Sequence, residues 1–247
     1  MMLAAAAAAV ALTAHHAPAH ARLMSCVKST DPGARVAVFE GNMRAWRHSR
    51  RLQLRFHLQS RTPQDPVWRT VRAPGFDRWL SSERGVRRFV YDKRVERLAA
   101  PASYRVVVRF RWRNARGRVV GRAQHTSRTC REPDPRPNLV VRKLLVYRLS
   151  PARARYVAVV ANTGRTAADV FALRFDRLGL GLGEVFGGPL APGHTARVHL
   201  DAAACRAGDP LDALADPDGL IDEHSEADNR LQVRCAYTPA ASKGHLH

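Results

Sequence analysis

The stretch Asn138–Gly164 reads NLVVRKLLVYRLSPARARYVAVVANTG and decides the fold class of the second half of the chain. Its two apolar runs, Leu144–Tyr147 and Tyr156–Val160, are rich in Val, Leu and Tyr and are joined by a short polar connection. Runs of this composition and length are typical of β-strands. The second run ends in Asn-Thr-Gly, and Asn and Gly suit left-handed turn positions. The stretch therefore predicts two β-strands that open an all-β domain.

Apolar runs at Val170–Phe175 and Thr195–Leu200 predict two further strands of the same domain. Between them, Leu178–Gly193 is rich in glycine. It lacks the lysine of a phosphate-binding loop and does not fit a dinucleotide-binding pattern, so we predict no nucleotide site there.

Five pieces of the second half also carry a family resemblance. They are Asn138–Val141 (NLVV), Val159–Gly164 (VVANTG), Ala167–Leu173 (AADVFAL), Leu190–Gly193 (LAPG) and Asp216–Asn229, which holds DPDG and IDEHSEADN. In order and spacing they resemble CARDB, the cell-adhesion-related domain found in bacteria, although that family usually has Asn where this chain has Asp228. The resemblance implies an immunoglobulin-like β-sandwich on an exported or surface protein, used as an accessory module without catalysis.

The first half carries its clearest strand pattern at Tyr104–Trp112 (YRVVVRFRW). Aromatic and Val side chains fall on one face of this stretch, and Arg side chains fall mainly on the other. Leu52–Leu58 alternates in the same way with polar residues, and Val86–Val95 predicts another strand. No helix of ordinary length shows a 3.6-residue period. Short strands separated by Gly and Pro turns therefore predict a β-sandwich here too.

Within this half, Leu98–Val108 contains a Pro turn followed by Tyr104. The segment resembles the tyrosine corner of fibronectin type III domains. This resemblance implies an immunoglobulin-like sandwich, and Trp68 is a candidate for its aromatic residue on the third strand.

The N-terminus has the features of a signal peptide. Met2–Ala14 is an apolar run, and Ala19-His20-Ala21 offers small residues at the positions that a signal peptidase reads, so we predict a cut after Ala21. The run is shorter than the roughly 20 residues that span a bilayer, and no other stretch is apolar enough to do so. The predicted organisation is a signal peptide (1–21), a basic sandwich (22–132), a Pro-rich linker (133–137), a CARDB-like sandwich (138–238) and a disordered tail (239–247).

The four cysteines are Cys26, Cys130, Cys205 and Cys235. An even number in an exported chain indicates disulfides, and four cysteines allow three pairings. Their positions near the ends of the two halves favour Cys26–Cys130 and Cys205–Cys235, one bridge in each domain. An alternative is a lipobox at Leu23–Cys26, although Arg22 interrupts the apolar run before it.

The net charge of +20 is concentrated in the first half. Residues 22–133 hold 27 Lys and Arg against 8 Asp and Glu, whereas residues 134–247 hold 14 against 13, and only four of the 41 cations are lysine. Arginine forks match phosphate and carboxylate, so one interpretation is an anion-binding face. The other is a GC-rich genome, in which Arg codons displace Lys codons.

The candidate anion-binding residues are Arg105, Arg109, Arg111, Arg113, Arg118 and Arg122. An acidic glycan or another anionic cell-wall polymer would suit such a ladder of charges. Nucleic acid is the least favoured partner, because aromatic side chains that could stack on bases are expected on the inner face. The alternative is a solvated outer face whose charges prevent pairing with another sheet.

A dense acidic turn follows Asp216. Asp216, Asp218, Asp222 and Glu226 are candidate ligands for Ca²⁺, because this ion prefers carboxylate oxygens. The alternative is a turn in which Asp, Asn and Ser side chains accept hydrogen bonds from backbone N–H groups. No other cofactor is predicted.

The sequence shows no recognisable catalytic signature, so we do not predict an enzyme. Three functions remain open. The chain could be a secreted or cell-surface interaction module of the adhesion type, with an unknown protein as partner. It could bind an anionic cell-wall polymer through its Arg face, or it could be an accessory domain of an extracellular hydrolase system.

Overall fold

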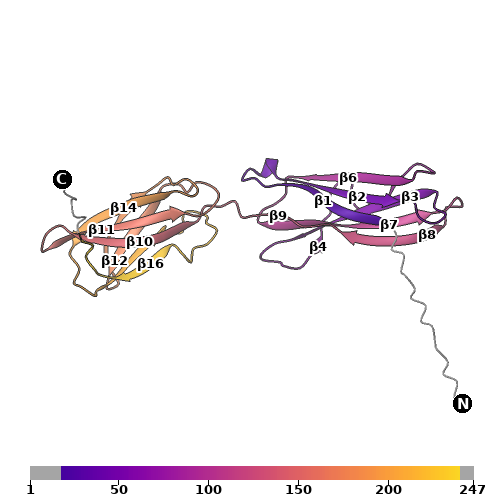
Figure 1. The fold of residues 1–247 in the computed structure, drawn as a ribbon. Coiled ribbons are helices and arrows are strands. Elements are labelled where there is room, and N and C mark those ends of the chain that lie inside the picture. The colour runs from indigo at the N-terminus through magenta and orange to yellow at the C-terminus, as the bar shows by residue number, and fades with distance from the viewer. Residues whose placement is uncertain (1–17, 240–247) are drawn as a thin grey trace, which may run out of the picture. The chain divides into compact units, whose positions relative to one another are not determined.

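The computed structural model describes residues 18–239, which are almost entirely β-strands and turns (Figure 1). The chain divides into two compact units between Glu132 and Pro133, and each unit contains two antiparallel sheets. The predicted all-β, immunoglobulin-like class is therefore confirmed. Within the described part of the chain, no helix is long and apolar enough to cross a membrane. The apolar run of the predicted signal peptide, and all of the predicted tail except Pro239, lie outside the described residues.

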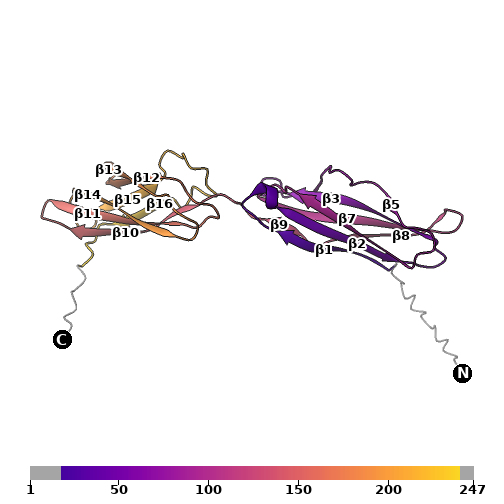
Figure 2. The same cartoon turned by 90° about the horizontal axis from the view of Figure 1, so that it is seen from above.

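The first domain is a sandwich of a three-stranded and a six-stranded sheet (Figures 1 and 2). The smaller sheet has the order β1-β2-β6, with bounds Ala19–Val27, Val36–Arg44 and Arg88–Glu96. The larger sheet is built on β4-β3-β7-β8, with bounds Arg69–Thr70, Arg51–Arg61, Ala102–Arg113 and Val119–Thr126. The short strands β5 (Leu80–Ser81) and β9 (Cys130–Glu132) extend the larger sheet, and a 3-10 turn lies at Pro32–Ala34.

The core of the first domain is formed by the alternating residues of both sheets. Phe39 from β2, Phe56 from β3 and Phe110 from β7 are almost fully buried. Trp112 is also buried, and its indole Nε1 donates a hydrogen bond to the carbonyl of Arg44 at 2.7 Å. The opposite face of β7 is thereby turned toward solvent, which fixes the position of its arginines.

The segment that resembled a tyrosine corner has the corresponding hydrogen bond. The hydroxyl of Tyr104 donates to the carbonyl of Ala99 at 3.1 Å, and Leu98 is buried beside it. A tyrosine hydroxyl bonded to backbone a few residues upstream characterises this corner. The core tryptophan is Trp112, however, and the expectation that Trp68 fills this role is wrong, because Trp68 lies half-buried on the outer face of the larger sheet.

The start of the first domain differs from the predicted boundary at residue 22. Ala19, His20 and Ala21 belong to β1 and pair with Met43, Asn42 and Gly41 of β2. A cut after Ala21 would remove three residues from this edge strand. The existence of a signal peptide stays a prediction, and the first strand among the described residues begins at Ala19.

The second domain is a smaller sandwich of three and four strands (Figure 1). One sheet has the order β10-β11-β14, with bounds Leu139–Arg148, Arg153–Asn162 and Thr195–Ala203. The other has the order β13-β12-β15-β16, with bounds Leu180–Gly187, Phe171–Arg177, Pro210–Ala215 and Arg230–Arg234. The predicted strand pair in Asn138–Gly164 is β10 and β11, which pair antiparallel.

The Asn-Thr-Gly that ends β11 holds the beginning and end of the domain together. The buried side chain of Asn162 accepts hydrogen bonds from the backbone N–H groups of Asn138 and Gly164, and it donates to the carbonyls of Thr166 and Leu190. All four hydrogen-bonding positions of the amide are therefore used. A Cβ on Gly164 would lie 2.4–2.5 Å from the backbone that enters β10, so only glycine fits there.

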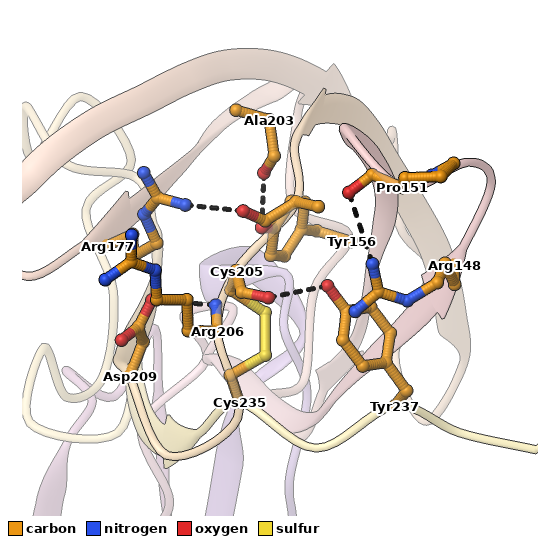
Figure 3. The surroundings of a disulfide bond; sticks show 11 residues. Arg148, Pro151, Tyr156, Arg177, Ala203, Cys205, Arg206, Asp209, Cys235 and Tyr237 are labelled. Atoms are coloured by element: carbon orange, nitrogen blue, oxygen red, sulfur yellow. Dashed lines mark hydrogen bonds between the residues drawn. A yellow bond between two sulfur atoms is a disulfide. The ribbon is translucent and has the colours of Figure 1, made fainter.

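Each domain has one disulfide, as predicted. Cys26–Cys130 joins β1 to β9 with a Cα–Cα distance of 5.5 Å, and Cys205–Cys235 joins the ends of β14 and β16 with a distance of 6.3 Å. Both bridges connect the two sheets of one sandwich. Figure 3 shows that the carbonyl of Cys205 also accepts a hydrogen bond from the hydroxyl of Tyr237 at 2.7 Å. This bond fixes the last described segment next to the bridge.

Candidate anion-binding face

The outer face of the larger sheet in the first domain is lined by arginines from three neighbouring strands. Along β7, the buried residues alternate with Arg105, Arg109, Arg111 and Arg113, as the sequence pattern predicted. The face continues on both neighbours of β7, because residues directly opposite each other share a face. We define the arginine face as Arg51, Arg55 and Arg61 on β3, the four arginines of β7, and Arg122 on β8.

Not every predicted residue lies within this sheet. Arg122 is directly opposite Arg111 on β7 and is exposed. Arg118 lies instead in the hairpin turn before β8, where its backbone N–H donates to the side chain of Asn114 at 3.0 Å. The sequence pattern therefore identified five strand residues of the face, and Arg118 is a turn residue at its end.

Three pairs of arginines on this face stand directly opposite each other. The register pairs Arg51 with Arg113 and Arg55 with Arg109 across β3 and β7, and Arg111 with Arg122 across β7 and β8. Like charges in directly opposed positions destabilise a sheet, by about 0.2–1 kcal/mol per pair on the scale of cross-strand interactions. The face therefore carries an electrostatic cost that a sheet selected only for stability would avoid.

Neutral side chains, not carboxylates, orient the arginines of β7. The Nε of Arg105 donates to Gln59 at 2.9 Å, and that of Arg109 donates to Gln124 at 3.1 Å. The remaining two donate to the same oxygen: Oε1 of Gln53 accepts from Nε of Arg111 at 2.6 Å and from Nε of Arg113 at 2.7 Å. A glutamine fixes a guanidinium in place without neutralising it, so the positive charge remains available to a ligand.

The second domain provides an internal comparison. There, Arg155 makes two hydrogen bonds to the carboxylate of Asp201, at 2.7 and 2.8 Å, and Arg230 pairs with Asp212. By contrast, none of the ion pairs found among residues 18–239 includes a member of the arginine face. The contrast is between the arginine face and these pairs, not between the two domains. The first domain also holds paired arginines, such as Arg69 and Arg94, and the second holds exposed arginines outside any of these ion pairs, such as Arg197 and Arg206.

Two tryptophans lie over the arginine face. The Cζ atoms of Arg111 and Arg55 lie 3.7 and 4.9 Å from the ring centre of Trp79, and those of Arg105 and Arg61 lie 4.1 and 4.7 Å from that of Trp68. Each indole thus contacts one arginine from β3 and one from β7. The aromatic side chains of β7 lie on the inner face, as expected, whereas these two tryptophans reach the outer face from the irregular segments around β4 and β5.

Burial and neighbouring arginines lower the pKa of two members of the arginine face. Burial lowers the pKa of Arg111, and the neighbouring Arg113, Arg55 and Arg122 lower it further. Burial and then Arg61 likewise lower the pKa of Arg105. In both cases the charged form is disfavoured by its surroundings, so a bound anion would relieve this penalty.

Two carboxylates lie near the face, and each has a partner outside the arginine face. Asp77 pairs with His57 of β3, and Asp65 pairs with Arg69 of β4. The pKa of His57 is lowered chiefly by burial, although Asp77 opposes this effect. Neither carboxylate pairs with a member of the arginine face.

The acidic turn brings together some of the predicted cation ligands but not all. Carboxylate oxygens of Asp216, Glu223 and Glu226 lie within 4.8 Å of one another, and Glu223 was not among the predicted ligands. Asp222 instead pairs with Arg136 at 2.6 Å, and Asp218 is exposed on the turn. The predicted four-residue set is therefore split.

The carboxylates of this turn accept hydrogen bonds from the protein itself. Asp216 accepts from the backbone N–H groups of Leu220 and Ile221, and Glu223 accepts from the backbone N–H of Leu139 and from Asn229. Burial is the main cause that raises the pKa of Glu223. These bonds attach the turn to the beginning of β10, which is the alternative that the sequence left open.

The comparisons with known proteins give likenesses of fold. No protein-family profile and no curated protein matches the chain. A bacterial adhesin from Mobiluncus mulieris with disulfide, isopeptide and ester cross-links has a TM-score of 0.30 and 10% identity, over 89% of this chain and 94% of that one. A domain assigned to a cell surface protein of Methanosarcina acetivorans has a TM-score of 0.38 and 18% identity, over 44% and 98%.

A CARDB domain from Pyrococcus furiosus, solved in complex with di-metal ions, has a TM-score of 0.36 and 18% identity, over 42% of this chain and 90% of that one. At these TM-scores the similarities establish nothing about ligand or activity. The resemblance to CARDB that the sequence motifs carried is thus also found among solved structures.

Proposed function

We propose that this chain is an extracytoplasmic, non-catalytic binding module whose first domain holds an anionic polymer of the cell envelope on the arginine face. The observation that carries the proposal is the set of three directly opposed Arg pairs, none of whose members forms an ion pair with a carboxylate of residues 18–239. Fixed positive charges of this kind favour a ligand with repeated negative charges, because each anionic group can lie between neighbouring arginines.

The disulfides support the proposed compartment. Both bridges connect the two sheets of a sandwich, and disulfides of this structural kind persist in oxidising compartments outside the cytoplasm. An arginine face in that setting meets envelope polymers in preference to nucleic acid. The wider class is the interaction module predicted from the sequence, and the arginine face adds the chemistry of its partner.

The test is retention of the full chain on purified bacterial cell wall and on immobilised polygalacturonate across a range of salt concentrations. We expect retention that falls steeply with salt, because the ligand displaces counterions as it binds. The variant Arg109→Gln/Arg113→Gln should bind more weakly and show a shallower salt dependence. Arg197→Gln/Arg206→Gln removes the same charge from exposed positions of the second domain and should behave like the unmodified chain. Equal losses in the two variants would show that net charge alone drives binding and would overturn the proposal.

A further inference from the structure

One hollow lies on the arginine face and a second lies at its end, and each is lined by four arginines. The first has a volume of about 410 Å³, is bordered by Trp79, and is lined by Arg55, Arg109, Arg111 and Arg122. The second has a volume of about 340 Å³, lies beside the 114–117 hairpin turn, and is lined by Arg50, Arg51, Arg84 and Arg113. Four arginines lining one small hollow indicate a site for a compact anionic group.

Gln53 connects the two hollows. Its Oε1 accepts from Arg111, which lines the first hollow, and from Arg113, which lines the second. Its Nε2 donates to the hydroxyl of Ser81 at 2.6 Å, and only 8% of the residue is exposed. One enclosed amide therefore sets the orientation of one arginine in each hollow.

Each hollow is also lined by an arginine of β3 whose enclosed Nε is an unused donor. The Nε atoms of Arg55 in the first hollow and Arg51 in the second are enclosed and have no hydrogen-bond partner among the described residues. An enclosed donor without a hydrogen-bond partner destabilises the folded state. A ligand oxygen in the hollows would reach these enclosed donors only after the Arg51 and Arg55 side chains move.

The arrangement of the donors favours a tetrahedral anion. In the first hollow they come from β3, β7 and β8, which are three neighbouring strands. A planar carboxylate accepts best near its own plane, whereas the oxygens of a phosphate point in several directions. A phosphate group can therefore accept from arginines on all three strands at once.

The spacing favours consecutive groups of one chain. Arg111 lines the first hollow and Arg113 the second, and these two residues are about 6.5–7 Å apart along β7. Successive phosphates of an extended phosphodiester chain with a short polyol spacer can span this distance.

We propose that the two hollows are consecutive subsites for successive phosphate groups of a linear polyol-phosphate or sugar-phosphate polymer, with Gln53 as the residue that positions both. This inference rests on the proposed function and names the chemistry of its ligand. Nucleic acid is less favoured, since each indole on the face is already in contact with two guanidinium groups and the disulfides indicate an extracytoplasmic compartment.

The experiment is a calorimetric titration of the full chain with four probes: glycerol 1-phosphate, a diester-linked glycerol-phosphate trimer, trigalacturonate and an oligothymidylate with the same number of charges as the trimer. We expect the phosphate trimer to bind at least 10-fold more tightly than the monomer and than the matched carboxylate and nucleotide oligomers.

The variants test the role of Gln53. Gln53→Ala should reduce the affinity ratio of trimer to monomer at least fivefold. Gln59→Ala is the matched control, because Gln59 lies on the same face of β3 but holds only Arg105, and its ratio should stay unchanged. Arg111→Lys keeps the charge but loses the bond to Gln53, so we expect salt-dependent binding without the preference for phosphate.

The outcomes separate the two proposals. If trigalacturonate binds as well as the phosphate trimer, the phosphate assignment is wrong and the anionic-polymer function stands. Equal or tighter binding of oligothymidylate would assign the face to nucleic acid instead. An unchanged ratio in correctly folded Gln53→Ala would contradict the coupling of the hollows. If no polymer binds at low salt, both proposals fail.

Discussion

Arg55 and Arg109 face each other across β3 and β7 without a carboxylate between them, so their repulsion should be measurable as a coupling energy. We expect Arg109→Gln to stabilise the first domain at low salt, because glutamine removes one charge and can still reach Gln124. A directly opposed like-charge pair costs about 0.2–1 kcal/mol. For a domain of this size that corresponds to an increase of about 1–5 °C in Tm.

The double-mutant cycle of Arg55→Gln and Arg109→Gln isolates the pair, because it cancels the loss of the contact between Arg55 and Trp79. The double variant should gain less stability than the sum of the single variants, by about 0.2–1 kcal/mol at 10 mM salt. The difference should vanish at 1 M salt, where the Debye length is only about 3 Å.

The assay is urea denaturation followed by tryptophan fluorescence. All four tryptophans lie in the first domain, so the signal reports that domain within the full chain. Urea is uncharged and leaves the electrostatic term intact. A coupling of zero at low salt, together with destabilisation by Arg109→Gln, would refute the interpretation of the face as a set of unneutralised, opposed charges.

The second domain unfolds without a tryptophan signal, so its predictions are read from calorimetry of the full chain. Asn162→Ala removes four hydrogen bonds and should lower the free energy of unfolding by about 2–4 kcal/mol; a loss under 0.5 kcal/mol would contradict the role of this amide. Gly164→Ala places a Cβ 2.4 Å from the backbone that enters β10 and should destabilise by about 1–3 kcal/mol, whereas Gly181→Ala, with no atom nearer than 3.8 Å, should cost much less. Because the pKa of Glu223 is raised in the folded state, this group stabilises the domain below pH about 4.5, and the stabilisation is lost as pH rises through the folded pKa. The Tm of the unmodified chain minus that of Glu223→Gln should therefore decrease from pH 4 to pH 7, and an increase would contradict the direction of the pKa shift. Because the carboxylate of Asp216 already accepts two backbone hydrogen bonds, millimolar Ca²⁺ should leave the Tm unchanged, and an upward shift would support a cation site in the acidic turn instead.

The sequence predicted those parts of the fold that depend on local pattern. The alternation in Tyr104–Trp112 became β7, and the apolar runs of Asn138–Gly164 became β10 and β11. The disulfide pairing followed from position along the chain and the compartment. The strand β13 was missed, because glycines at Leu180–Gly187 weaken the signal of a strand that is defined by its pairing with β12.

The candidate site was predicted only in part, for a physical reason. The arginines of β7 are visible in the sequence because their spacing is a property of one strand. Their opposition to Arg51 and Arg55 depends on the register of β3, and the positions of Trp68 and Trp79 depend on how irregular segments fold back over the sheet. Neither the strand register nor the positions of these tryptophans can be predicted from the residue spacing within one strand. The glutamines that alternate with arginines on β3 are visible in the sequence. That they accept hydrogen bonds from the arginines of β7 becomes clear only when the pairing of the two strands is known.

The central claim is that the ligand of this protein lies on the arginine face, and protection of arginines from phenylglyoxal tests it directly. The full chain would be modified with and without the glycerol-phosphate trimer, and the reacted residues identified by mass spectrometry. We predict that the trimer protects Arg109 and Arg122 and leaves Arg206 of the second domain as reactive as before. Protection of Arg206 with no change at Arg109 and Arg122 would contradict the claim.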